Sequence, residues 1–385
     1  MRTLRVGLLG LCVAAGLLSW GRGAEAWSHQ GHILITRMAL VRIIEDPASP
    51  KGLREFLQSQ MKSTQADCEK LATTEMVGAE PKSYLEGMDG ACTWPDRVQQ
   101  LDEGKKLLEP YGMAEQKMHF LDMEFFAQEV LYKPDMSCRP KLEDFPRDPK
   151  NWRYQQAGFL PFRVEEYYKK SVAALGKAGE PVNVEEATKS LGYLVHYLED
   201  AHQPHHSTID FKSLSYLAGK VLGVKEIKTP LQDGTEAISY KADRKVNPHG
   251  DIEFQIFENA EEPRAGLRKE LWKELNARID SKAKKEWSLR VFGEDEKAGE
   301  FDGFAETIRI LSESYGYLPT VGKAAVAAYA EGKFDAKAFF NSEDTVHREK
   351  MTMVQVIADR KAEAVLEVER VIRRAWADAK AGEKK

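Results

Sequence analysis

Residues 196–207, HYLEDAHQPHHS, concentrate side chains that can bind a metal ion. This stretch holds four of the chain's nine histidines, together with two carboxylates. His196 and Asp200 are four residues apart, so on a helix they would project from one face with about 40° between them. An imidazole nitrogen and a carboxylate oxygen at that spacing suit a metal such as zinc. The same spacing also occurs in ordinary polar pairs, so whether this pair belongs to a metal site depends on the other residues of the chain.

The helix that carries this pair is expected to cover residues 186–203. It should end before Pro204, because proline lacks a backbone N–H and disfavours a helical conformation in the residue before it. His206 would then return on a turn beside the same site. His202 and His205 fall elsewhere, and we expect them to be solvated or to support the ligands indirectly.

Four further short motifs hold residues of the same ligand types. NPHGDIEF places His249 and Glu253 four residues apart at the start of an expected helix. CTWPDRV contributes Asp96, MHFLDMEF contributes His119, and WSHQGH contributes His32. Borderline-soft Zn²⁺ takes imidazole nitrogen and carboxylate oxygen, so zinc is the expected cofactor.

In this order, the motifs resemble the zinc-dependent nuclease and phospholipase C superfamily. Its members include the S-one/P-one-type single-strand nucleases of fungi and plants and the bacterial phosphatidylcholine-type phospholipases C. The resemblance rests on W-x4-H, W-P-D, H-F-x-D and H-x3-D-x5-H with Gln-Pro inside it, and it covers roughly residues 27 to 260. It implies an all-α domain and an endonuclease that hydrolyses single-stranded DNA or RNA to 5′-phosphate products, closest to the nuclease branch.

The resemblance also implies a trinuclear zinc cluster and the ligands of each ion. The first zinc would be held by the free amine and carbonyl oxygen of Trp27, by His32 and by Asp200. The second would be held by Asp96, His119, His196 and Asp200, which bridges the two ions. The third would be held by His206, His249 and Glu253. A hydroxide between the bridged ions would attack phosphorus, and Asp96 could orient it.

Three residues are candidates for substrate binding. By the resemblance, Phe120 would stack on a nucleobase and Asp122 would bond its edge, although core packing is the alternative for Phe120. Nucleases of this type usually carry arginine where this chain has Gln99, so Arg97 is the candidate substitute. Nucleases of this type usually have aspartate where this chain has Glu253, and the glutamate resembles the phospholipase version of the motif. A phospholipase C-type phosphodiesterase acting on phosphatidylcholine-like lipids is therefore the alternative, and an inactive secreted zinc-binding protein is a remote one.

The first 26 residues are typical of a signal peptide. A basic start precedes an apolar run from about residue 6 to 18, and Ala24-Glu25-Ala26 fits an A-x-A cleavage site. We expect a secreted or periplasmic protein that begins at Trp27, with no transmembrane segment and no stable protein partner implied. The leader's three arginines and one glutamate carry +2, so cleavage takes the net charge from −5 to −7. Local positive charge, such as bound metal, would have to attract a nucleic acid.

Most of the chain is expected to be helical, in one domain over residues 27–385. Apolar residues recur at helical spacing in 32–44, 51–62, 163–176, 186–203, 264–280, 302–330 and 344–378. One small β-hairpin is expected at 227–242, turning at Asp233-Gly234, and the stretch 208–247 around it is a candidate lid. Residues 380–385 are expected to be a disordered tail. Three cysteines remain after cleavage, Cys68, Cys92 and Cys138, so at most one disulfide can form.

Overall fold

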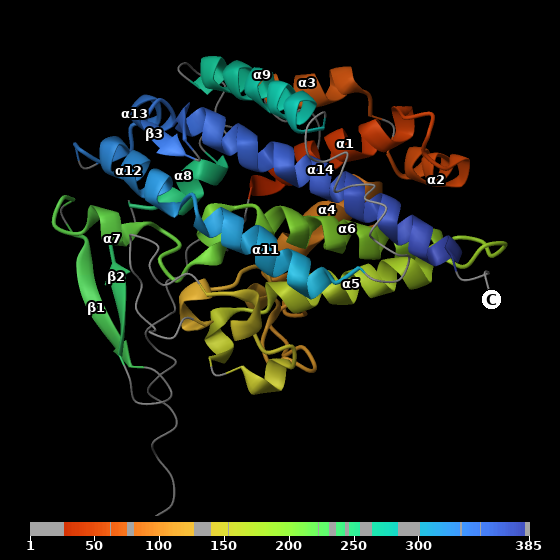
Figure 1. The fold of residues 1–385 in the computed structure, drawn as a ribbon, viewed down its shortest axis with the longest axis horizontal. Helices are drawn as coiled ribbons and strands as arrows, with labels where there is room; N and C mark the ends of the chain where they lie inside the picture. Colours follow the sequence, from red (N-terminus) through yellow and green to blue (C-terminus); the bar gives the residue numbers. More distant parts are fainter. Residues whose placement is uncertain are drawn as a thin grey trace, which may run out of the picture.

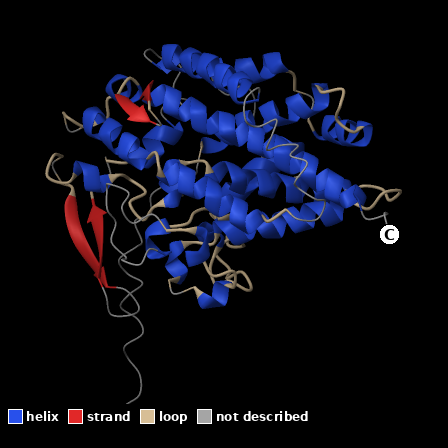
Figure 2. Ribbon diagram, viewed as in Figure 1, coloured by secondary structure: helices blue, strands red, loops and turns tan. Residues whose placement is uncertain are grey.

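The computed structural model describes residues 27–61, 63–74, 81–126, 140–152, 154–221, 223–230, 236–242, 246–254, 264–283, 301–331, 333–346 and 348–381. The expected signal peptide, Cys138, the Asp233-Gly234 turn and residues 382–385 of the expected tail lie outside these ranges. Helices dominate the described residues, as Figure 2 shows, and this confirms the all-α prediction.

The helices are α1 (Ser28–Glu45), α2 (Lys51–Gln60), α3 (Gln65–Thr73), α4 (Gly87–Val98), α5 (Leu160–Leu175), α6 (Val184–Ala201), α7 (Leu214–Leu217), α8 (Pro248–Phe254), α9 (Arg264–Lys282), α11 (Gly303–Tyr315), α12 (Leu318–Ala328), α13 (Ala336–Phe340) and α14 (Met353–Lys380). Short 3-10 helices lie between some of them, including η1 (Glu115–Met118) and η6 (Pro204–Ser207). Two antiparallel hairpins pair β1 (Lys225–Pro230) with β2 (Glu236–Lys241), and β3 (Glu343–Val346) with β4 (Glu349–Thr352).

Two of the expected helices differ from the observed ones. The predicted helix over 302–330 is two helices, α11 and α12, with a break at Gly316-Tyr317. The predicted helix over 344–378 begins only at Met353, because its first residues form the β3–β4 hairpin. The hairpin expected at 227–242 is confirmed as β1 and β2, which lie beside α7 (Figure 1).

Helix α6 is the element around which the others are arranged. It packs against α5, which precedes it in the sequence, and against α4, α11 and α14, which come from more distant parts of the chain (Figure 1). Gly192 allows the approach of α4, because a Cβ there would lie only 2.2 Å from the Cβ of Ala91. A larger residue at position 192 would therefore push apart the two helices that carry His196 and Asp96.

The C-terminal end of α6 is held by side chains from other helices. The last carbonyls of a helix have no partner within it. The Ser314 hydroxyl of α11 donates to the carbonyl of Ala201 at 2.6 Å, and Arg360 Nε of α14 donates to that of His202 at 3.1 Å. Pro204 then starts η6, and α6 ends at Ala201, two residues before the predicted end at residue 203.

No helix among the described residues is both long and apolar enough to cross a lipid bilayer. Cys68 and Cys92 are both buried thiols. Burial raises the pKa of Cys68 to about 12 and that of Cys92 well above its usual value, so both thiols stay protonated at neutral pH.

Candidate metal centre

Three groups of buried side chains bring together every predicted ligand side chain apart from Trp27. Within each group the ligand atoms lie within 4.8 Å of one another, and the groups are His32, His196 and Asp200; Asp96, His119 and His196; and His206, His249 and Glu253. Each of these side chains is at most 4% exposed. Buried ionisable groups are costly unless they are paired or bind metal, so this arrangement needs an explanation.

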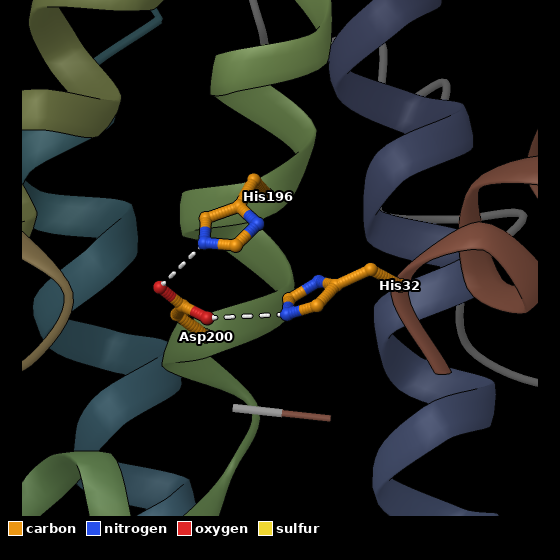
Figure 3. Close-up of side chains that lie close together, drawn as sticks. All are labelled: His32, His196 and Asp200. Atoms are coloured by element: carbon orange, nitrogen blue, oxygen red, sulfur yellow. Dashed lines mark ion pairs between the residues drawn. The ribbon is translucent and has the colours of Figure 1, made fainter. Parts of the chain in front are cut away.

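Four segments of the chain deliver the first two groups. His196 and Asp200 lie one turn apart on α6, and His32 reaches them from α1, as Figure 3 shows. Asp96 lies in the last turn of α4, and His119 directly follows η1. The i, i+4 spacing that the sequence suggested thus places both α6 ligands on the face turned toward α1 and α4.

Asp200 faces two groups at once. Its Oδ1 lies 3.7 Å from His32 Nε2. Its Oδ2 lies 2.9 Å from His119 Nδ1 and 3.4 Å from His196 Nε2. Because the two oxygens point to different imidazoles, this carboxylate is placed to bridge two ion positions.

Asp96 also reaches both groups, although the resemblance assigns it to the second ion alone. Its Oδ1 lies 3.6 Å from His119 Nδ1 and 3.6 Å from His196 Nε2, and its Oδ2 lies 3.7 Å from His32 Nε2. Gln99, which replaces the expected arginine, donates from Nε2 to Asp96 Oδ1 at 3.1 Å. Gln99 therefore orients this carboxylate.

The third group forms where η6 meets α8. His249 Nε2 is in contact with Glu253, one turn further along α8. His206 Nε2 lies 3.2 Å from His249 Nε2 and 3.8 Å from Glu253 Oε1. Gln203, the glutamine of the Gln-Pro pair, donates from Nε2 to Glu253 Oε1 at 3.0 Å. The turn at Pro204 thus returns His206 to the site, as its sequence position suggested.

Hydrogen bonds to backbone carbonyls set the protonation of two imidazoles. His196 Nδ1 donates to the carbonyl of Cys92 at 2.8 Å, and His206 Nδ1 donates to that of His119 at 2.6 Å. In its neutral form each ring then has its lone pair on Nε2. Those lone pairs face further ring nitrogens, His119 Nδ1 at 3.1 Å and His249 Nε2 at 3.2 Å. A cation between the nitrogens would satisfy both members of each pair.

The ligand atoms are close enough together to share a metal ion, for which zinc sets the scale. Tetrahedral zinc binds nitrogen and oxygen at about 2.0–2.2 Å, which places neighbouring ligand atoms about 3.3–3.6 Å apart. The separations across the first two groups run from 2.9 to 3.7 Å. Two of the facing atoms, His32 Nε2 and Asp200 Oδ1, are buried and have no hydrogen-bond partner among the described residues. The residues present therefore fit a bound metal ion.

The protonation states of the centre respond to the same contacts. Burial lowers the pKa of His249, which keeps it neutral, as a metal ligand must be. Burial alone would raise the pKa of Asp200, but His196 and His119 hold it well below its usual range. Burial opposes charge on His196 too, yet Asp200 and Asp96 raise its pKa. Protons and metal ions therefore compete for these nitrogens, and acid should release the metal.

Glu199 is a residue of the site that sequence reasoning missed. Its Oε2 lies 2.5 Å from His32 Nδ1, and its Oε1 accepts from the Thr36 hydroxyl at 2.8 Å. Its backbone carbonyl accepts the indole N–H of Trp27 at 2.8 Å. Burial raises the pKa of Glu199, and a cation at His32 Nε2 would favour its charged form. Its position directly before Asp200 could have indicated that Glu199 lies close to the site.

Trp27 is buried, with 1% of its surface exposed, at the start of α1. Lys361 Nζ of α14 lies 3.9 Å from the centroid of its ring. Burial lowers the pKa of Lys361 to about 7. The indole is therefore fixed from two sides, by Glu199 and by Lys361, while the ligand role of the Trp27 amine and carbonyl stays a prediction.

The predicted substrate-binding residues lie beside the second group. Phe120 is half-buried, and Lys117 Nζ lies 4.9 Å from the centroid of its ring. Asp122 is 9% exposed, and burial together with Glu124 raises its pKa well above the usual range. Arg97 is half-buried directly after Asp96 on α4. Their contacts with a substrate stay predictions.

The two remaining histidines of the opening stretch are not solvated. His202 and His205 are each 1% exposed. His202 Nδ1 donates to the carbonyl of Leu198 at 2.8 Å, and His205 Nε2 lies 2.7 Å from the Ser213 hydroxyl. Helix α14 and the loop after η6 cover these positions, and the sequence pattern does not reveal such cover.

Glu124→Gln should stabilise the metal-free protein at neutral and alkaline pH. Burial raises the pKa of Glu124 from 4.5 to about 7, so its contribution to stability is full below about pH 4.5 and is lost as pH rises through 7. Its oxygens accept from the Thr208 hydroxyl and, at 3.2 Å, from the backbone N–H of Ile209, and a glutamine oxygen can also accept hydrogen bonds. The free energy of unfolding can be measured with urea in the presence of a metal chelator, between pH 5 and 9. Over this range the wild type should lose up to about 3 kcal/mol of that free energy relative to the variant. If the unfolding free energies of the two proteins change in parallel with pH, Glu124 does not have a pKa raised by burial.

Comparison with models of known protein families finds no match for this chain, and comparison with curated proteins finds no significant one.

Proposed function

We propose that this chain is a secreted zinc-dependent phosphodiester hydrolase, and that its substrate is single-stranded nucleic acid, cleaved to 5′-phosphate products. The observation that carries the proposal is the meeting of three buried ligand groups, with Asp200 facing two of them. The sequence motifs that resemble the nuclease and phospholipase C superfamily supply the reaction class. This support is separate from the side-chain distances, because the order and spacing of the motifs are properties of the sequence alone.

The charges of the proposed metal ions and of their ligands would explain how a negatively charged substrate is attracted. Three zinc ions would carry twice the charge that the ligand carboxylates of Asp96, Asp200 and Glu253 offset. A phosphodiester could then bind a chain whose net charge is −5, or −7 after removal of the expected leader. Zinc held there would supply a water that ionises near pH 7 and positive charge to stabilise the phosphoryl oxygens.

The protein's own residues would orient the reaction. Hydrolysis forms a bond from the oxygen of water to phosphorus and breaks the bond to the 3′ oxygen, which takes up a proton. Asp96 would accept a hydrogen bond from the attacking water, and the bond from Gln99 fixes the direction of its Oδ1. Arg97, next along α4, would be the cation that binds a phosphate, in the role that arginine at position 99 would otherwise have.

The competing substrate is phosphatidylcholine, favoured by Glu253 in place of aspartate. Purified protein beginning at Trp27 should be assayed side by side on single-stranded DNA, RNA and phosphatidylcholine vesicles, with its zinc content measured. We expect turnover of the nucleic acids and little of the lipid. Turnover of the lipid alone would replace the nuclease proposal with the phospholipase one. Full zinc content without any turnover would mark a zinc-binding protein without catalysis.

Phe120→Ala should lower kcat/KM for single-stranded DNA by about tenfold, because a base stacked on an aromatic ring contributes about 1–3 kcal/mol. The ring packs over Gly158, where a Cβ would lie 2.9 Å from Phe120 Cδ2, and it is partly exposed. A simple aryl phosphodiester without a base should be nearly unaffected, and Phe120→Tyr should retain activity. Equal loss on both substrates would mean that Phe120 is a packing residue.

A further inference from the structure

The first ion position has no carboxylate of its own. Asp200, which the resemblance assigns to it, also faces the second position, and Asp96, whose Oδ2 lies 3.7 Å from His32 Nε2, is assigned to the second ion. The remaining expected ligands, His32 and the amine and carbonyl of Trp27, are neutral when they bind a metal. Two doubly charged ions that share a carboxylate also repel each other. A further negative charge close to the first position would therefore stabilise an ion there.

Glu199 places a buried carboxylate behind the His32 ring. Its Oε2 lies 2.5 Å from His32 Nδ1, while Nε2, on the other side of the ring, lies 3.7 Å from Asp200 Oδ1 (Figure 3). A neutral histidine that donates from Nδ1 has its lone pair on Nε2. A carboxylate that accepts this bond also makes the ring a stronger metal ligand. Glu199 can therefore act on an ion through the imidazole without touching the ion.

The Glu199 carboxylate is fixed in place by α1. Thr36 lies one turn after His32 on this helix, and its hydroxyl donates to Glu199 Oε1 at 2.8 Å. The side chains of all three residues are fully buried, so water does not compete for these bonds. The backbone of Glu199 is tied to the other two expected ligands, since its carbonyl accepts the indole N–H of Trp27 at 2.8 Å and its peptide bond leads to Asp200. One residue thus contacts every expected ligand of the first position.

Two other ligand imidazoles donate to neutral acceptors instead. His196 Nδ1 and His206 Nδ1 donate to the backbone carbonyls of Cys92 and His119, at 2.8 Å and 2.6 Å. A carbonyl fixes the tautomer and the direction of a ring, but it brings no net charge. The acceptor behind His32 is a carboxylate, and it lies at the position that has no carboxylate ligand of its own. The difference therefore falls where extra negative charge is needed.

Resting on the zinc cluster of the proposed function, we propose that Glu199 is a positioning residue for the first ion, which holds the His32 lone pair toward that ion and supplies the negative charge that its ligands lack. Glu199 sets the affinity of the first position and leaves the other two unchanged. Carboxylates that accept a hydrogen bond from a ligand histidine change metal affinity by about 10–100-fold.

The test measures zinc affinity rather than turnover. Zinc-loaded protein beginning at Trp27 is dialysed against buffers of graded free zinc concentration, and its bound zinc is measured by elemental analysis. Glu199→Gln keeps the shape and a hydrogen-bond acceptor but removes the charge. One ion of this variant should dissociate at a free zinc concentration about 10–100-fold higher than in the wild type, and the other two should stay bound. Excess zinc should restore full occupancy, because all the ligands remain.

Glu124→Gln is the matched control. Glu124 is also a buried glutamate that accepts from a threonine hydroxyl, that of Thr208, and it belongs to none of the three ligand groups. This variant should bind zinc as the wild type does.

Two further variants separate the proposed role from a general disturbance. Thr36→Val removes the hydrogen bond to Oε1 and keeps Glu199, so it should weaken the same ion by about two- to tenfold, and it tests the proposal even if Glu199→Gln does not fold. His32→Ala should lack the first ion. In that background Glu199→Gln should leave the affinities of the two remaining ions unchanged, because its effect passes through the His32 ring.

Unchanged zinc affinity in Glu199→Gln, or an equal weakening of all the ions, would overturn the proposal. Turnover of single-stranded DNA by the wild type tests the proposed function separately. If Glu199→Gln loses one ion selectively, the inference stands even when the wild type cleaves no nucleic acid. If the wild type cleaves DNA and Glu199→Gln keeps every ion under the same conditions, only the inference fails. A wild type that binds no zinc would overturn both.

Discussion

Asp200→Ala should lower the zinc content from about three ions to about one and reduce phosphodiester hydrolysis by at least about a thousandfold, since bound metal supplies several kcal/mol to such reactions. The reason is geometric. Asp200 Oδ1 faces His32, whereas Oδ2 faces His119 and His196. Removing one side chain therefore takes a ligand from two ion positions together. Elemental analysis of the purified variant measures the effect directly.

Glu253→Ala is the matched control, because Glu253 belongs to the third ligand group and to neither of the other two. This variant should lose about one zinc ion and keep about two. Circular dichroism of both variants and the wild type in chelator separates metal loss from misfolding. If Asp200→Ala loses no more zinc than Glu253→Ala does, the carboxylate does not bridge two ions.

The sequence predicted which histidines and carboxylates come together, because helical spacing carries direct geometric information. His196 and Asp200 on α6, and His249 and Glu253 on α8, each lie one turn apart as their numbering requires. The proline at position 204 ends α6 for a local steric reason. Asp96 reaches the α6 face that carries His196 and Asp200 only through the packing of α4 on α6. The sequence indicated this long-range contact only through the resemblance of the motif to other proteins.

Element boundaries were less predictable where the chain breaks a helix without an obvious signal. Pro319 lies in the first turn of α12, where its missing N–H costs nothing, so a new helix starts although the apolar spacing continues. The β3–β4 hairpin turns through Arg348 at a φ of 73°, a conformation that usually calls for glycine or asparagine. Neither residue type marks this turn, so apolar spacing favoured a helix.

The neighbours of a residue were the least predictable feature. Glu199 and His205 are polar residues that could face solvent, yet both are buried. Glu199 contacts His32, which is distant along the chain, and His205 contacts Ser213 across a loop. Local pattern reports which side chains could share a face, whereas tertiary packing decides what covers that face.

Retaining one residue before Trp27 should remove about one zinc ion and lower activity by at least about a hundredfold. A backbone nitrogen can ligate zinc only as a free amine, and with the leader attached it is an amide. The indole of Trp27 is already fixed by the carbonyl of Glu199 and by Lys361. Ser28 follows with a left-handed φ of 61°, so the chain turns sharply at this point. The precursor should therefore be nearly inactive, and cleavage on export would activate it and spare the cell's own RNA.

The test compares protein that begins at Trp27 with protein that keeps Ala26. We expect similar circular dichroism, because the buried indole contacts do not depend on the amine. The shorter form should also lose its extra zinc ion as pH falls below about 7.7–8.0, the ordinary pKa range of an α-amine, since protons compete with metal for that nitrogen. The longer form should show no such step. Full activity and equal zinc content with Ala26 retained would mean that Trp27 is a packing residue and that the first ion is held by side chains alone.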